Sequence, residues 1–259
     1  MAMENRDTAK KWDAMANRFD SLKIPQWESD PFLKVLSSLP IWDKKPKVLD
    51  LGCGAGRFSI AVADRCSSVL GSDISPKMIE FAKEKKKKFN ADNVSFEVLD
   101  WHEADIEKTE KAFDIIFGHM TPAIDSIEAV EKMNKACKGY CAMATFAKRQ
   151  AKTRDELEKL LGISSSWHKS EKAGEIFKYL FENGFLPQVS YYERDDSSVF
   201  ESVDDAFNYL KSEIFLGTNS YDNTYEEKIK AFIKSKMNDG VFKNEVNSTI
   251  ITISWKVGK

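Results

Sequence analysis

The sequence predicts an α/β fold, in which helices cover both faces of a doubly wound, mostly parallel sheet of seven strands. Three observations lead to this prediction. Short apolar runs alternate with segments whose apolar residues recur at helical spacing. The first run, residues 48–51, leads directly into a glycine-rich turn, and three successive runs carry an aspartate at or near their ends. The last predicted strand, residues 249–257, alternates strictly and is expected to form an antiparallel C-terminal edge strand.

A helical N-terminal extension, residues 1–42, is predicted ahead of the first strand. Residues 8–20 place Trp12 and Phe19 on one apolar face, and residues 31–39 repeat this helical pattern. The extension either folds over a ligand cleft as a lid or packs onto the core. The sequence leaves both alternatives open.

The first strand ends in three alternating glycines, Gly52, Gly54 and Gly56, and Asp50 precedes them. Because glycine has no Cβ, a ligand can lie against the bare backbone of this turn and meet amide groups at the start of a helix. The dinucleotide-binding motif G-x-G-x-x-G needs its third glycine where this chain has Arg57. The spacing therefore argues against a nicotinamide dinucleotide.

Each of the next two predicted strands ends in an acid at the same edge of the sheet. Residues 69–72 lead into Asp73, which is expected beside the glycine turn and can accept hydrogen bonds from a ribose diol. Residues 94–99 lead into Asp100 and Trp101, a carboxylate for an exocyclic amine and an aromatic face for a purine. Because ligands of open α/β sheets bind at the carboxyl edge, these residues predict a nucleoside site there.

Taken together, these segments resemble the class I S-adenosylmethionine-dependent methyltransferases over roughly residues 45–148. The motifs LDLGCGAG, GSDISPKMIEFA, FEVLDW and FDIIFGHM follow one another in the order and spacing of that family. The resemblance implies a Rossmann-like fold and an enzyme that transfers methyl groups. It also implies S-adenosyl-L-methionine as the cofactor.

The resemblance further implies which residues contact the cofactor. The glycine turn would hold the methionine part, and Asp50 would order the turn and the cofactor's amino group. Asp73 would meet the ribose hydroxyls, and Asp100 would meet the adenine amine. The implied cofactor-binding residues are Asp50, Gly52, Cys53, Gly54, Gly56, Asp73, Ile74, Met78, Asp100, Trp101 and Gly118.

The fourth predicted strand, residues 113–118, ends where an acceptor should meet the methyl group. Gly118 permits close backbone approach, and Pro122 fixes the turn that follows. His119 is the candidate catalytic base, because imidazole can accept a proton at about pH 7. Alternatively, His119 is a hydrogen-bonded strand-end residue or a contact that positions the cofactor. The segment lacks the N/D-P-P-F/Y signature of amine- and base-modifying members, which argues against methylation of DNA bases or glutamine amides.

Other candidate side chains carry weaker signals. His102 follows the adenine-binding pair and is predicted to be a loop residue, whereas His168 precedes a helix on a segment that could reach a substrate. None of the four cysteines belongs to a C-x-x-C pair, so the sequence predicts neither a metal site nor a disulfide framework.

Capping boxes predict helix starts at Thr153, Ser202 and Thr224, and the last two lie in a long segment, residues 196–247. This helical insert before the last strand either caps the cleft and sets substrate specificity or serves as a packing element or dimer surface. The predicted methyltransferase domain then comprises residues 43–195 and 248–259.

The formal net charge of −2, from 39 basic and 41 acidic residues, gives no overall attraction to nucleic acid or to an anionic membrane. No apolar run reaches the roughly 18 residues of a membrane-spanning helix, and the N-terminal residues do not resemble a signal peptide. We therefore expect a cytoplasmic enzyme with a small-molecule acceptor, without nucleic-acid or membrane partners. The alternatives are a methyltransferase for tRNA or protein, a nicotinamide-dependent oxidoreductase, and a cofactor-binding protein without enzymatic activity.

Overall fold

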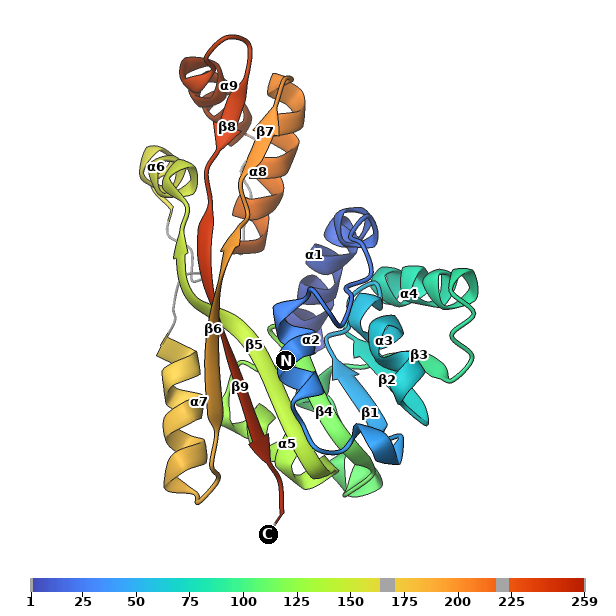
Figure 1. Cartoon of the computed structure of the whole chain (residues 1–259). Coiled ribbons are helices and arrows are strands. Elements are labelled where there is room, and N and C mark those ends of the chain that lie inside the picture. Colours follow the sequence, from blue (N-terminus) through green and yellow to red (C-terminus); the bar gives the residue numbers. More distant parts are fainter. Residues whose placement is uncertain (1, 164–170, 218–223, 259) are drawn as a thin grey trace. The chain divides into compact units, whose positions relative to one another are not determined.

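The computed structural model describes residues 2–163, 171–217 and 224–258 (Figure 1). The chain divides into two compact units. The first unit comprises Met1–Thr145, Glu171–Tyr191 and Ile251–Lys259, and the second comprises Phe146–Ser170 and Tyr192–Ile250. The predicted insert, residues 196–247, therefore belongs to the second unit, which also takes in residues 146–170.

The main sheet has seven strands in the order β3-β2-β1-β4-β5-β9-β6. The neighbouring pairs among β1 to β5 are all parallel. From β1 the chain builds the sheet outwards in one direction through β2 and β3, and from β4 it builds in the other direction. In open α/β sheets, ligands bind outside the carboxyl ends of the strands at such a change of direction. The strand bounds are β1 (Lys47–Leu51), β2 (Ser68–Asp73), β3 (Val94–Val98), β4 (Phe113–His119), β5 (Cys137–Gln150), β6 (Gln188–Asp195) and β9 (Asn247–Lys256).

The C-terminal strand β9 is antiparallel to β6. Side-chain hydrogen bonds join Ser190 to Thr252 and Glu193 to Thr249, so the residue numbers of the two strands run in opposite directions. The predicted fold class is confirmed, but β9 lies between β5 and β6, and the edge strand is β6. In keeping with this inner position, the small polar residues Thr252 and Ser254 of the alternating strand are buried along with its apolar residues.

Helices cover both faces of the sheet in the first unit. Because crossovers between parallel strands are right-handed in nearly all proteins, α3 and α4, which follow β1 and β2, are expected on one face of the sheet and α5, which follows β4, on the other. On these faces α1 contacts α4, and α5 contacts α7 (Figure 1). The helix bounds are α1 (Ala2–Asp20), α2 (Pro31–Ser37), α3 (Arg57–Val62), α4 (Pro76–Lys88), α5 (Ile127–Ala136) and α7 (Glu171–Glu182). Short 3₁₀ helices are η1 (Trp42–Lys44), η2 (Ala63–Arg65), η3 (Trp101–Glu103) and η4 (Ile106–Thr109).

The second unit has a hydrophobic core of its own, built from α6 (Lys152–Leu161), α8 (Val203–Gly217), α9 (Tyr225–Lys236) and β8 (Phe242–Asn244). The strand β8 pairs antiparallel with β7 (Ser198–Phe200). The sequence predicted the three helices and neither strand. A strand of three residues is too short for alternation to reveal it.

Only one of the three predicted capping boxes forms. Ser202 Oγ accepts the backbone N–H of Asp205 at 3.3 Å, as predicted. The capping box at Thr153 does not form, because α6 begins at Lys152 with the buried Ala151 as its N-cap, so that Thr153 already lies inside the helix. At Thr224 the predicted helix start is confirmed, since α9 begins at Tyr225, but Thr224 makes no capping bond with its side chain. Its backbone already has helical torsion angles, whereas a capping side chain needs an extended backbone to reach the first amides.

Candidate cofactor site

The three glycines of the turn after β1 all have positive φ angles, 61° at Gly52, 53° at Gly54 and 78° at Gly56. A Cβ at Gly52 would lie 1.8 Å from Thr121 Oγ1, and one at Gly56 would lie 2.7 Å from an aromatic ring. At Gly54 the nearest atom would be Met78 Sδ, 3.9 Å away. Protein packing thus requires two of the glycines, whereas the space at Gly54 remains open and fits a ligand lying against the backbone.

Asp73, at the end of β2, is bonded to this turn. Its Oδ2 accepts the backbone N–H of Gly54 at 2.9 Å, and its Oδ1 accepts that of Ser75 at 2.9 Å. Burial raises the pKa of Asp73 above its ordinary value, and the two amide hydrogen bonds act in the opposite direction. A carboxylate offers about four acceptor positions, so each oxygen still has room for a ribose hydroxyl.

Asp50, near the end of β1, is buried and accepts a hydrogen bond from Ser59 Oγ at 2.6 Å. Burial raises the pKa of Asp50 to about 7. The Ser59 hydrogen bond lowers it, and the nearby carboxylate of Asp73 raises it further. A positively charged group would favour the ionised form of Asp50. This environment therefore suits the contact with a cofactor amino group that the resemblance implies.

Cys53 contributes its backbone to the same turn. Its N–H donates to the carbonyl oxygen of Ser72 at 2.9 Å. Burial raises the pKa of the Cys53 thiol well above its ordinary value. A thiol that stays protonated is a poor nucleophile, so the side chain fits a packing role.

The adenine-side candidates lie at the end of β3. Leu99 N–H donates to Asp73 O at 3.0 Å, which places Asp100 close to the end of β2. The Oδ1 atom of Asp100 accepts the N–H of His102 at 2.9 Å. Trp101 is almost fully buried, and its indole N–H donates to Ala129 O at 3.1 Å. The Trp101 ring thus packs against α5.

The sequence did not single out Asp13 on α1, which reaches the start of α4. Its Oδ1 lies 2.5 Å from Ser75 Oγ and 3.1 Å from Lys77 N. Nearby, the buried Ala16 packs against Met78, the residue below the open space at Gly54. No local signal marks an acidic residue inside a helix as a contact of this kind. The tertiary fold alone identifies Asp13.

His119, at the end of β4, lies in an aromatic cluster. Its ring centroid is 4.2 Å from that of Phe58 and 5.0 Å from that of Phe32. A Cβ at the preceding Gly118 would lie 2.6 Å from Ile124 Cδ1, so this glycine is also fixed by protein packing. The structure therefore brings His119 to the predicted acceptor end of the sheet, and its imidazole packs against two phenylalanines.

The other histidines lie elsewhere. His102 Nε2 is 3.4 Å from Asp125 Oδ1 on the surface, and His168 lies outside the described residues. Within residues 2–163, 171–217 and 224–258, no three His, Cys, Asp or Glu side chains are grouped so that they could hold a metal ion. In the same ranges, no helix has both the length and the apolar character needed to cross a membrane.

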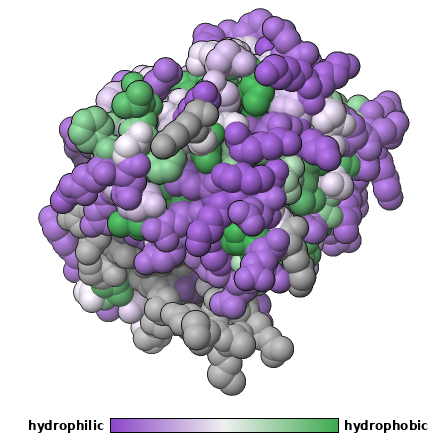
Figure 2. All heavy atoms as spheres, turned by 90° about the horizontal axis from the view of Figure 1, so that it is seen from below, coloured by the Kyte–Doolittle hydropathy of each residue, from purple (hydrophilic) through white to green (hydrophobic). Residues whose placement is uncertain are grey.

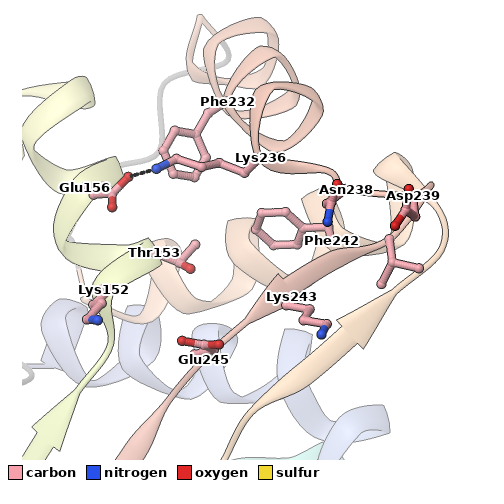
Figure 3. Close-up of a pocket in the computed structure, with 11 residues that line it drawn as sticks. Lys152, Thr153, Glu156, Phe232, Lys236, Asn238, Asp239, Phe242, Lys243 and Glu245 are labelled. Atoms are coloured by element: carbon pink, nitrogen blue, oxygen red, sulfur yellow. Dashed lines mark ion pairs between the residues drawn. The ribbon is translucent and has the colours of Figure 1, made fainter.

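A cavity of about 430 Å³ lies in the second unit, beside α6, α9 and β8 (Figure 3). The Phe232 and Phe242 side chains face it, and Lys236 Nζ pairs with Glu156 Oε2 at 2.6 Å. Its lining includes three lysines and three acids, Lys152, Lys236, Lys243, Glu156, Asp239 and Glu245. Because these charges balance, the lining favours neither an anion nor a cation, and no predicted site residue lies here.

The fold is similar to those of known structures at low sequence identity. The YcgJ protein from Bacillus subtilis has a TM-score of 0.54 and 16% identity, over 83% of this chain and 93% of that one. A protein from Bacillus halodurans, provisionally assigned as a methyltransferase, has a TM-score of 0.55 and 15% identity, over 87% and 97% of the two chains. These similarities show the fold alone.

Sequence relatives match a shorter segment. The carboxy-S-adenosyl-L-methionine synthase of Helicobacter pylori is 40% identical over 76 residues, 28% of this chain and 30% of that protein. The release factor glutamine methyltransferase of Fusobacterium nucleatum is 35% identical over 79 residues, 30% of this chain and 22% of that protein. The chain thus matches less than a third of the length of either relative.

A family model described as "Methyltransferase domain" matches residues 43–185, more than half of the chain. This match includes the glycine turn and the acids at the ends of β2 and β3. The match argues against the alternative of a nicotinamide-dependent oxidoreductase. The family's cofactor also fits the site, because the space at Gly54 is open and Asp73 has free acceptor positions. The chain belongs to the class I S-adenosyl-L-methionine-dependent methyltransferases.

Proposed function

We propose that this protein transfers a methyl group from S-adenosyl-L-methionine to a small-molecule acceptor. When bound, the cofactor supplies a methyl group that its sulfonium has already activated for in-line displacement. The task of the chain is to hold the acceptor in line, to exclude water and, for a protonated acceptor, to remove a proton. A fixed catalytic triad is not required for this chemistry.

Three groups of the first unit would hold the cofactor. The open backbone at Gly54 would receive the methionine part, and Asp50 would face its amino group. Asp73 would accept hydrogen bonds from the ribose, with Ile74 and Met78 beside the nucleoside. The predictions for Asp100 with the adenine amine and for Trp101 beside the ring complete the proposal.

The observation that carries the acceptor class is the aromatic cluster at the end of β4. His119 packs there against Phe58 and Phe32. Residues 118–123 contain no lysine or arginine. Proteins that bind nucleic acid rely on cationic side chains to contact phosphates. Phe58 and Phe32 are buried and His119 is only partly exposed, and such an apolar environment suits a small acceptor with apolar character.

A macromolecular acceptor has less support. The segment shared with the release factor glutamine methyltransferase covers only 22% of that protein. This chain has Gly118-His119-Met120-Thr121 where amine-modifying members carry the N/D-P-P-F/Y signature. Figure 2 shows a largely hydrophilic face on which hydrophobic residues lie in small separate groups, which gives no support for a large apolar protein interface on that face.

A cytoplasmic location is also part of the proposal. The four cysteines are free thiols, and all four are buried. Unpaired thiols suit a reducing compartment.

The test has two steps. Calorimetry with S-adenosyl-L-homocysteine should give saturable binding to the wild type and at least about tenfold weaker binding to Asp73→Asn, which loses charge at the ribose site. Cofactor with a radiolabelled methyl group should then label the metabolite fraction of a cell extract. Transfer to the RNA or protein fraction alone would refute the small-molecule acceptor, and absence of cofactor binding would refute the enzymatic proposal itself.

A further inference from the structure

Thr121 contacts two glycines of the cofactor site from the loop that follows β4. A Cβ at Gly52 would lie 1.8 Å from Thr121 Oγ1 and 2.6 Å from Thr121 Cβ. A Cβ at Gly118 would lie 2.9 Å from Thr121 Cγ2. The threonine side chain thus occupies space that both glycines leave free, one on the glycine turn and one on β4.

The backbone of this loop is held in an unusual conformation. Met120 has a φ angle of 55°, which non-glycine residues rarely adopt, and its N–H donates to Ala144 O at 2.9 Å. Thr121 Oγ1 accepts the N–H of Ala123 at 3.1 Å, which fixes the next turn. Left-handed conformations of non-glycine residues are unfavourable and persist where the surrounding structure imposes them, often at ligand sites. Here the strained residue turns the chain back, so that Thr121 lies on Gly52.

We infer that Thr121 is a positioning residue for methyl transfer. It fixes the acceptor-side loop, residues 120–123, against the cofactor-side turn at Gly52, and so sets the spacing between the two reactants. This inference rests on the proposed function, because residues 120–123 matter for spacing only if the acceptor binds there. A misplacement of about 1 Å can cost about 100-fold in rate, so a side chain that fixes this spacing has a measurable effect.

Two substitutions separate the contribution of the Thr121 hydroxyl from that of its methyl group. Thr121→Ser keeps Oγ1 and its bond from Ala123, whereas Thr121→Val keeps the shape and loses that acceptor. We expect Thr121→Ser to bind S-adenosyl-L-homocysteine nearly as well as the wild type, and Thr121→Val to bind about tenfold more weakly. Thermal unfolding should show similar midpoints for both variants, because a merely structural role would lower stability and leave affinity unchanged.

A rescue experiment tests the contact with Gly52 directly. Gly52→Ala should abolish binding, since its Cβ meets Thr121 Oγ1. Adding Thr121→Gly removes every threonine side-chain atom from that space and should restore part of the affinity. Gly162→Ala is the matched control, because Gly162 has a similar φ of 67° and no atom within 4 Å of the added Cβ. This control should bind like the wild type.

The outcomes distinguish the inference from the proposed function. If the wild type does not bind S-adenosyl-L-homocysteine, the proposed function fails. If the wild type binds but Thr121→Val both binds S-adenosyl-L-homocysteine and labels the metabolite fraction as well as the wild type, or the double variant binds more weakly than Gly52→Ala, the role of Thr121 is refuted and the proposed function stands. If Gly52→Ala is unfolded by circular dichroism, the comparison of Thr121→Ser with Thr121→Val decides alone.

Discussion

Two carboxyl groups beside the glycine turn, at the ends of β1 and β2, have environments that disfavour their charged forms. Asp50 and Asp73 are both buried, and burial raises the pKa of each. Their nearness adds to the effect at Asp50. In a folded protein this arrangement costs stability at neutral pH, and a cationic ligand offsets that cost. The site is therefore more stable with its ligand bound than without it. Measuring the stability of the ligand-free protein as a function of pH tests this.

We predict that stability falls as the pH rises from about 4 to about 7. The folded-state pKa of Asp50, about 7, lies above the ordinary value of 3.8, so the folded state binds more protons than the unfolded state in this range. The free energy of unfolding, measured in urea at a series of pH values, should decline across it.

Asp50→Asn keeps an acceptor for Ser59 and should reduce this decline, whereas the exposed Asp92→Asn should leave it unchanged. Equal pH profiles for the wild type and Asp50→Asn would contradict the prediction. Asp73 contributes in the same direction, so the decline should be reduced rather than abolished.

His119 has two possible roles that one pair of variants separates. His119→Phe keeps a ring against Phe58 and Phe32, whereas His119→Ala removes it. If His119 is the base, both variants should lower kcat by about 100-fold or more with little change in cofactor affinity. If it only packs, His119→Phe should be nearly as active as the wild type. Steady-state kinetics with the identified acceptor gives the answer.

At the scale of elements, the sequence predicted the strands that carry the site, because each combines an apolar run with a turn or acid that ends it. β1 precedes three glycines, β2 ends in Asp73, and β3 precedes Asp100. The missed features depend on contacts distant in sequence. Asp13 and Thr121 reach the site only through the docking of α1 and the fold-back after β4. β7 and β8 depend on each other for pairing.

Helix α1 is attached to both ends of α4, and this attachment leads to a prediction about Asp13. Its carboxylate accepts hydrogen bonds from Ser75 and Lys77 at the start of α4, while Asp20 pairs with the nearly buried Lys85 at 2.7 Å near its end. Asp13→Ala should lower stability by about 1 kcal/mol, as loss of a helix cap does.

The same substitution should increase proteolysis within residues 2–20, because it weakens the contact that holds α1 at the start of α4. Glu80→Ala, on the exposed side of α4, is the control. If Asp13→Ala matches this control in urea unfolding and in proteolysis, α1 does not depend on this contact. A loss of cofactor affinity in Asp13→Ala alone would support the lid alternative for the N-terminal extension.

At the scale of the whole molecule, the chain has two units with separate hydrophobic cores. The candidate cofactor site lies within the first unit, since every residue implied by the resemblance lies between Asp50 and Gly118. A ligand stabilises the part of a protein that binds it, by mass action. We therefore predict that S-adenosyl-L-homocysteine slows hydrogen exchange in β1, β2 and β4 and leaves α8 and α9 unchanged.

A core substitution in the second unit provides the converse test. Ile229 is fully buried, so Ile229→Ala should destabilise α8 and α9 by about 2–5 kcal/mol. Its affinity for S-adenosyl-L-homocysteine should equal that of the wild type, whereas Ile116→Ala, at a fully buried site in β4, should weaken binding. If the ligand instead protects α9 as strongly as β1, or if Ile229→Ala loses cofactor affinity, the two units unfold as one. The second unit would then stabilise the cofactor site, in addition to any part that it has in the choice of acceptor.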